Sequence, residues 1–268
     1  MLSRSFSLSL TLASTLLCSL VAGPAIAQEI TEQGQFQFNP QPGSSVGFMP
    51  TDRRMPIRTA SGGRRGTCAA TDAAVVPLLP QNGGALSATE SPSFWVYVPA
   101  GVKGTAHFRL TDASQADFDY QSVALPERGG LVKVELSQAS KALRAGETYQ
   151  WFFSVDCTAT DDDGMLEAGR SQDTFVTGWV RYEPLAASTQ AEALQGSTLD
   201  QAIAFARLGY WHDSLDRIAN LRNLQNLQQT GAAGAEASGA WDELLNTAGL
   251  EVQTDGAIVP LAELISRR

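Results

Sequence analysis

The chain has 268 residues, of which 43% are hydrophobic and 18% are charged, which is enough apolar material for a packed core and excludes a disordered or collagen-like chain. Acidic residues outnumber basic ones by 28 to 19, and the formal net charge of −9 disfavours nucleic-acid binding, because phosphate recognition needs a basic surface. With 2 histidines and 3 cysteines, most histidine-based catalytic sites and most zinc sites lack their residues.

The first 27 residues have the pattern of a secretory signal peptide. Arg4 supplies a positive start, an apolar run extends from Phe6 to Ala22, and Ala25-Ile26-Ala27 is a small-x-small cleavage signal. A membrane anchor would need about 20 strongly apolar residues, whereas this run is diluted by serine and threonine. We therefore predict cleavage between Ala27 and Gln28 and an extracytoplasmic protein, either periplasmic or secreted.

Residues 28–66 are rich in Gln, Gly, Pro, Ser and Asn and are predicted to form a flexible or loosely docked linker. Its end carries five arginines, of which we select the last two, Arg64 and Arg65, as candidate contacts for a partner or ligand. The basic stretch either binds an external anion, such as an acidic glycan or membrane surface, or docks on the acidic body of the same chain. We favour docking within the chain, because a tethered surface is always present at high effective concentration.

Loss of a signal peptide removes Cys18 and leaves Cys68 and Cys157. Two cysteines in an oxidising compartment predict one disulfide, which in the chain-entropy model would contribute about 4–5 kcal/mol. Two unbonded buried thiols are the alternative. Cys18 itself is disfavoured as a lipoprotein anchor, because the Leu17 side chain that precedes it is bulky.

Residues 67–184 are predicted to form an antiparallel, immunoglobulin-like β-sandwich of about seven strands. Runs rich in Val, Phe, Tyr, Trp and Thr recur between turn signals, and no segment between them is long enough for the crossover helices of a parallel sheet. The spacing of cysteines and tryptophans differs from that of antibody domains. The expected strands are Ala74–Leu79, Phe94–Val98, Thr105–Thr111, Phe118–Leu125, Leu131–Leu136, Thr148–Cys157 and Thr174–Tyr182.

Residues 185–268 are predicted to be a helical segment that packs on the sandwich. Ser197 and Asp200 form a capping pattern before the first helix, and a second helix begins near Trp211. The stretch TGAAGAEASGA at 230–240 reads as a flexible break before a third helix. The segment AFARLGYWHDSLDRIANL resembles half of a tetratricopeptide repeat, and since one copy cannot form a solenoid, we expect a helical hairpin.

The motifs of common catalytic sites are absent from the sequence: it has no nucleophile elbow, phosphate-binding loop or zinc-protease motif. We interpret His107 and His212 as structural residues, and we expect no cofactor and no catalytic activity. Two weaker alternatives remain open. One is a hydrolase that uses a pair of carboxylates, and the other is a weak calcium site formed by Asp161, Asp163 and Glu167.

Aromatic side chains are the remaining candidates for recognition, since tryptophan and tyrosine stack on sugars and anchor protein partners. We select Trp95 and Tyr97 on the second expected strand and Trp211 at the start of a helix. For Trp95 the sequence does not separate this role from core filling.

Five ordered blocks of the sequence resemble the cyanobacterial domain-of-unknown-function 928 family, from roughly residue 53 to the C-terminus. They are GGRRGTC at 62–68, SPSFWVYVP at 91–99, LRAGETYQWFFSVDC at 143–157, DTFVTGWVRY at 173–182 and ARLGYWHDSL at 206–215. The resemblance implies a secreted or periplasmic cyanobacterial protein and carries no activity or catalytic residues. The chain departs from the family pattern in loop 158–172 and near the C-terminus.

The sequence thus favours an extracytoplasmic, non-catalytic binding or scaffolding module that engages another envelope protein. A carbohydrate- or cell-wall-binding module is the alternative.

Overall fold

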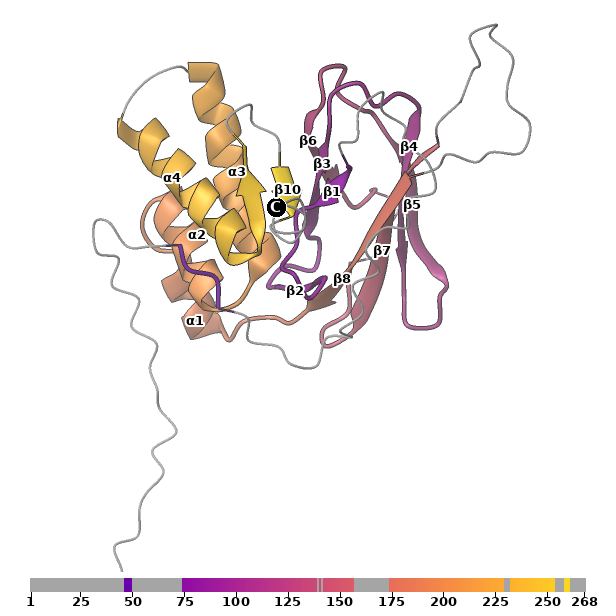
Figure 1. Ribbon diagram of the computed structural model, residues 1–268. Coiled ribbons are helices and arrows are strands. Elements are labelled where there is room, and N and C mark those ends of the chain that lie inside the picture. The colour runs from indigo at the N-terminus through magenta and orange to yellow at the C-terminus, as the bar shows by residue number, and fades with distance from the viewer. Residues whose placement is uncertain are drawn as a thin grey trace, which may run out of the picture. The chain divides into compact units, whose positions relative to one another are not determined.

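The computed structural model describes residues 46–49, 74–138, 140, 142–156, 174–228, 232–253 and 258–260. The chain divides into two compact units, Met1–Phe36 and Gln37–Arg268, and all described residues belong to the second. This second unit is mostly β-structure followed by a mainly helical part (Figure 1).

The described strands of the second unit form two larger sheets and a short hairpin. The three-stranded sheet has the order β1-β3-β6, made of Val76–Pro77, Ser93–Val98 and Gly130–Glu135. The five-stranded sheet has the order β2-β8-β7-β4-β5, made of Gly84–Ser87, Thr174–Tyr182, Thr148–Asp156, Thr105–Thr111 and Asp117–Val123. The hairpin pairs β9, Leu250–Val252, with β10, Ile258–Pro260.

One strand pair corrects the prediction of a wholly antiparallel arrangement. Strand β2 runs parallel to β8, and Gly84 lies opposite Trp179 in the register. A parallel pair needs a long crossover connection. Here the strands and loops between Ser87 and Thr174 provide that connection, so no crossover helix is required.

Among the described residues, four helices follow β8: α1 is Ala187–Ala193, α2 is Thr198–Arg207, α3 is Trp211–Gln228 and α4 is Ala232–Thr247. The predicted cap of α2 is confirmed, because Ser197 and Asp200 form a reciprocal capping box. The break expected at 230–240 is wrong from Ala232 onward, where α4 begins. Ala237 and Ala240 are buried on the same helix as Trp241, and this packing outweighs the low helix propensity of the nearby glycines.

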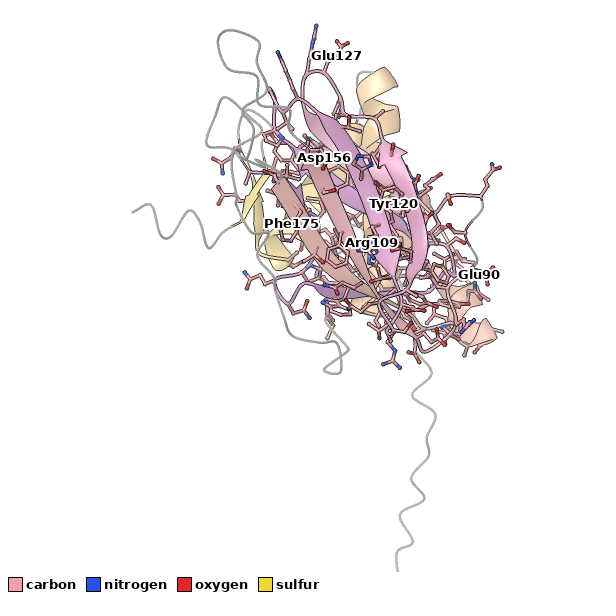
Figure 2. All side chains as sticks on the ribbon, turned by 90° about the vertical axis from the view of Figure 1, so that its right-hand side faces the viewer. Glu90, Arg109, Tyr120, Glu127, Asp156 and Phe175 are labelled. Carbon is pink, nitrogen blue, oxygen red and sulfur yellow. The ribbon has the colours of Figure 1, made fainter. Side chains whose placement is uncertain are left out.

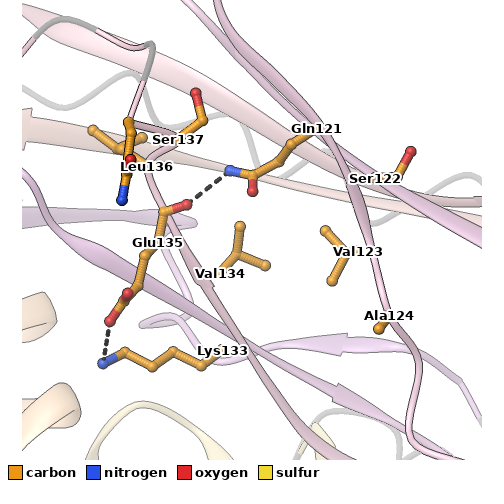
Figure 3. A pocket seen from close by; sticks show the side chains of 10 residues that line it. Gln121, Ser122, Val123, Ala124, Lys133, Val134, Glu135, Leu136 and Ser137 are labelled. Carbon is orange, nitrogen blue, oxygen red and sulfur yellow. Dashed lines mark hydrogen bonds and ion pairs between the residues drawn. The ribbon is translucent and has the colours of Figure 1, made fainter.

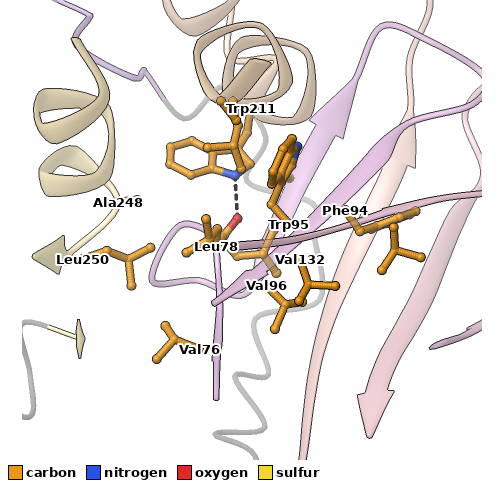
Figure 4. Packing of buried hydrophobic residues seen from close by; sticks show 14 of the residues in the cluster. Val76, Leu78, Phe94, Trp95, Val96, Val132, Trp211, Ala248 and Leu250 are labelled. Carbon is orange, nitrogen blue, oxygen red and sulfur yellow. Dashed lines mark hydrogen bonds between the residues drawn. The ribbon is translucent and has the colours of Figure 1, made fainter. Parts of the chain in front are cut away.

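Strand β3 lies between the five-stranded sheet on one side and the helices on the other (Figures 1 and 4). The Phe94 ring packs against the rings of Phe108 and Trp151, with centroids 4.9 and 5.6 Å apart. The next residue, Trp95, faces α3, where its Nε1–H donates to Asp216 Oδ1 at 3.1 Å. Because both faces of β3 are covered, its sequence SFWVYV is almost continuously apolar and does not alternate.

Residues 46–49, which fall within the predicted linker, are docked on the helices. The Val46 N–H donates to Glu243 Oε2 at 3.0 Å, and the Phe48 ring meets the Trp211 ring edge-on at 5.0 Å. This short segment is therefore part of the packed structure.

Candidate functional site: the outer face of the five-stranded sheet

The five-stranded sheet has one face in the core and one face turned away from it (Figure 2). In β4, Ala106, Phe108 and Leu110 are fully buried, so the alternating residues point to the other side. We call this other side the outer face. The strand register assigns to it His107, Arg109, Tyr120, Phe152, Ser154, Asp156, Phe175 and Trp179.

Aromatic side chains on this face are accessible. Tyr120 is 61% exposed and Phe175 is 37% exposed, while Phe152 and Trp179 are half-buried. Tyr120 and Phe152 both lie opposite Arg109 in the register, so the three residues occupy neighbouring positions on three adjacent strands. Exposed aromatic rings gathered on a rigid sheet mark a candidate interaction surface.

His107 holds the Tyr120 ring in place. The two rings are stacked, with centroids 5.6 Å apart and planes inclined by 11°. The Tyr120 hydroxyl lies 3.2 Å from His107 Nδ1, and Asp156 Oδ2 lies 3.3 Å from His107 Nε2. The imidazole is thus fixed from both nitrogens, and the exposed Tyr120 ring is oriented before anything binds to it.

Arg109 is oriented by an ion pair with Asp117 from the neighbouring strand. Both side chains are exposed, so the pair contributes little to stability. Its main effect is to orient the guanidinium toward Asp117 on the exposed face of the sheet.

The aromatic residues selected from the sequence lie elsewhere. Trp95 is 3% exposed and Trp211 is 0% exposed, and both belong to the packing between the sheets and α3. The Trp211 indole N–H donates to the Leu78 carbonyl oxygen at 2.9 Å, and the half-buried Tyr97 packs against the same core. Neither tryptophan is accessible to a partner in this structure, whereas the exposed rings of the outer face were not selected.

Alternation in the sequence contains a signal for one of these residues. Phe175 directly precedes the core residue Val176, so strand periodicity turns it away from the core. Tyr120 has no such signal, because Phe118, two residues before it, packs on the core and the register shifts between Leu110 and Thr111. Other predicted site residues lie outside the part of the chain that the structure describes, and their roles stay predictions. These are Cys68, Cys157, Arg64, Arg65, Ala27 and Gln28, and also Asp161, Asp163 and Glu167 of the calcium alternative.

A groove of about 510 Å³ runs between the edge strands β5 and β6 (Figure 3). Across it, Gln121 Nε2 donates to the Glu135 carbonyl oxygen at 2.7 Å. Asp119 accepts hydrogen bonds from the Ser137 amide at 3.0 Å and the Ser137 hydroxyl at 2.7 Å. Burial opposes ionisation of Asp119, but these hydrogen bonds outweigh it and hold the pKa of the carboxyl below its usual value.

Three polar residues at the start of α3 are buried: His212, Asp213 and Ser214. The His212 Nδ1–H donates to the Ser93 carbonyl oxygen at 3.1 Å, and Asp213 accepts from the Ala88 amide at 2.7 Å. Consecutive helix positions diverge by about a quarter turn, and no hydrogen bond joins these side chains within the described residues. His212 and Asp213 therefore fasten α3 to residues at β3 and after β2, and the three side chains do not form a catalytic triad.

Within the described ranges, no group of three or more His, Cys, Asp or Glu residues is placed to hold a metal ion. None of the described helices is long and apolar enough to cross a membrane.

A family model described as Domain of Unknown Function (DUF928) matches residues 60–258. The chain belongs to this family. The DUF928 match begins before β1 and ends at the first residue of β10, so it includes both the outer face and the groove. No curated protein matches the chain.

Proposed function

We propose that this DUF928 protein is an extracytoplasmic, non-catalytic binding module that engages another envelope protein through the outer face. The observation that carries the proposal is the exposure of Tyr120 and Phe175 on one sheet face, with the ion-paired Arg109 on one of the two strands that separate them. The extracytoplasmic setting, and with it an envelope partner, rests on the signal-peptide pattern of residues 1–27.

The composition of the outer face suits a protein contact. Tyrosine, tryptophan, phenylalanine and arginine are enriched in protein interfaces, and a few such residues carry most of the binding free energy. The rings of this face stand on a five-stranded sheet, and Tyr120 is further held by His107. Little conformational entropy is therefore lost when a partner covers them.

The test replaces one exposed ring at a time. A photo-crosslinking amino acid at Phe175, in cells of the native host, identifies the partner, and the purified pair then gives a dissociation constant. We expect Tyr120→Ala and Phe175→Ala each to weaken binding by about tenfold or more. Leu194 is the matched control, since it is 44% exposed and apolar but caps the C-terminal end of α1.

Equal crosslinking from positions 194 and 175 would contradict the proposal. So would a partner whose affinity is unchanged by both outer-face substitutions.

Glycan binding is the second candidate, and the stacking of Tyr120 on His107 favours it. The Tyr120 ring is held nearly parallel to the imidazole below it, which leaves a flat ring face of the kind on which sugars stack. Calorimetry with soluble cell-wall oligosaccharides separates the candidates. Binding that survives Tyr120→Phe and is lost in Tyr120→Ala supports the glycan, and no heat with any oligosaccharide removes it.

The finer fold assignment is also a proposal: an immunoglobulin-like sandwich followed by a tetratricopeptide-like hairpin of α2 and α3. The packing of Phe94 against Phe108 and Trp151 supports the first, because it joins two sheets through a shared core. Gly209, which ends α2 with a φ of 82°, supports the second. An experimental structure superposed on both folds checks the assignment.

A further inference from the structure

Strand β6 is the edge of its sheet, and its outer side faces the groove (Figure 3). It pairs with β3 in an antiparallel register that places Trp95 opposite Lys133 and Ser93 opposite Glu135. The two sides of β6 therefore differ: one is occupied by β3, and the other borders the groove.

The register reveals which backbone groups of β6 point into the groove. The Trp95 carbonyl oxygen accepts from the Leu78 amide at 3.0 Å, on the side of β3 away from β6. In an antiparallel pair the N–H and C=O of one residue point to the same side, so Trp95 and Lys133 form a non-hydrogen-bonded pair. Lys133 and Glu135 consequently direct their backbone groups toward the groove, and Leu131, which does not line the groove, directs its groups to the same side of β6.

Side chains of β5 occupy one end of this edge. Gln121 donates to the Glu135 carbonyl oxygen, and Asp119 accepts from the Ser137 amide. At Leu131 and Lys133 no partner for the backbone N–H and C=O occurs among the residues that the structure describes. Two donors and two acceptors of an edge strand thus remain open.

The Lys133 side chain does not cover this open edge. Lysine on an edge strand commonly blocks the addition of another strand. Here the Lys133 ammonium is held 3.1 Å from Asp216 Oδ1 of α3 and 2.7 Å from Glu135 Oε1. The charge is drawn toward the helix and is neutralised there, so it leaves the backbone accessible.

The lining of the groove suits an extended peptide. Val134 is buried, and Val123 and Leu136 are half-buried with their side chains packed against the core. A strand added beside Leu131 and Lys133 would place alternate side chains over this apolar surface. Backbone hydrogen bonds would supply affinity, and the apolar contacts would select the sequence.

We propose that the groove between β5 and β6, together with the adjoining open edge of β6, binds a short extended segment of another polypeptide, which pairs with Lys133 and Leu131 as a fourth strand of the three-stranded sheet. This site goes beyond the outer-face contact, because neither Tyr120 nor Phe175 lines it.

The experiment uses a peptide probe and the full chain. Random twelve-residue peptides displayed on phage are selected on the immobilised protein, and the strongest binder is synthesised with a fluorescent label. Fluorescence anisotropy then compares the wild type with Ala124→Trp, which fills the groove from an exposed position. Ala145→Trp is the matched control, since Ala145 is also exposed but lies in the turn before β7 and does not line the groove.

We expect Ala124→Trp to weaken peptide binding by at least about tenfold, and Ala145→Trp and Tyr120→Ala to leave it unchanged. Hydrogen exchange followed by NMR on the wild type should show the Leu131 and Lys133 amides exchanging about tenfold more slowly with peptide bound. This second measurement does not depend on the folding of any variant.

Three results overturn the proposal: a library that yields no peptide whose binding Ala124→Trp weakens, unchanged exchange at both amides, or protection confined to strands other than β6. Peptide binding that is lost in Tyr120→Ala and kept in Ala124→Trp would instead assign the peptide to the outer face. Evidence against peptide binding in the groove is thus distinguishable from evidence against partner binding at the outer face.

Discussion

His212 and Asp213 are neighbours in the chain, yet burial shifts their pKa values in opposite directions. Burial lowers the pKa of His212 to about 4, although the Ser93 carbonyl and Asp216 favour its charged form. Burial raises the pKa of Asp213 to about 6, against the opposing effects of the Ala88 amide and the Arg217 charge. In the folded state at mildly acidic pH, both side chains are therefore neutral.

These shifts have opposite effects on stability. The folded-state pKa of His212 lies below its unfolded value of 6.5, so its contribution is present above about pH 6.5 and is lost as the pH falls toward 4. The folded-state pKa of Asp213 lies above its unfolded value of 3.8, so its contribution is complete below that pH and is lost as the pH rises through 6. Between about pH 4 and 6 the two contributions compensate each other.

Replacing either residue with asparagine removes one of the two compensating contributions, so the pH dependence of the other should become measurable. Between pH 7 and pH 4, the free energy of unfolding of Asp213→Asn relative to the wild type should fall by up to about 3 kcal/mol. That of His212→Asn should rise by a similar amount, because the wild type alone has a histidine to protonate there. Urea unfolding at several pH values measures both differences. If the free energy of unfolding depended on pH in the same way in all three proteins, neither pKa would be shifted.

At the scale of a single element, strand β8 has a glycine, Gly178, directly opposite Trp151 of β7. A Cβ atom at Gly178 would lie 2.8 Å from the Trp151 ring and would also collide with Leu79. Trp151 cannot move aside, because it packs against Phe94 and Phe108 in the core between the sheets. The glycine is therefore required by close packing, and its backbone does not need a positive φ.

Gly178→Ala should lower the free energy of unfolding by about 1–3 kcal/mol, as overpacked cores do. The matched control is Gly239→Ala in α4, where an added Cβ meets nothing within 4 Å. There the higher helix propensity of alanine should raise stability by up to about 1 kcal/mol. Chemical denaturation of both variants checks the pair. A tolerated alanine at Gly178 would mean that β8 and the Trp151 ring are less tightly packed than described.

The elements that could be predicted from the sequence are those whose pattern is local. Strands β4 and β8 have the predicted bounds, because alternation and turn residues define them within a few positions. Strand β2, with the sequence GALS, has no such pattern and is a strand only because β8 pairs with it. The first half of α4 was missed because burial of its alanines against neighbouring elements outweighs its glycines.

The candidate site shows the same limit. An aromatic strand residue has equal periodicity whether its face is covered or open, so the sequence could not separate Trp95 from Tyr120. The deciding fact is that α3 covers the side of β3 that carries Trp95, while the described structure places no element over Tyr120. Such coverage depends on contacts more than 100 residues apart in the chain, such as that between Trp95 and Asp216.

On the scale of the second unit, one hydrophobic cluster includes residues from both sheets, from α2, α3 and α4, and from the β9–β10 hairpin. Hydrogen bonds buried between α3 and the strands reinforce it, among them Trp211 to Leu78 and Asp213 to Ala88. Separation of the helices would expose the side of β3 that carries Trp95, and separation of the five-stranded sheet would expose the side that carries Phe94. The described sheets and helices should therefore unfold together, despite their different sequence character.

Trp211 is the residue that tests this coupling. Trp211→Ala should lower the free energy of unfolding by about 3–5 kcal/mol, since it empties a fully buried site that both parts share. Trp211→Phe keeps most of the packing and removes the hydrogen bond to Leu78, so a loss of about 1–2 kcal/mol is expected.

Hydrogen exchange by mass spectrometry in moderate urea measures the opening of β7–β8 fragments and of α3–α4 fragments separately. In the wild type and in Trp211→Phe the two sets should open at the same free energy. Opening of the α3–α4 fragments while β7–β8 stays protected would mean that the helices dock on a sheet structure that is stable without them.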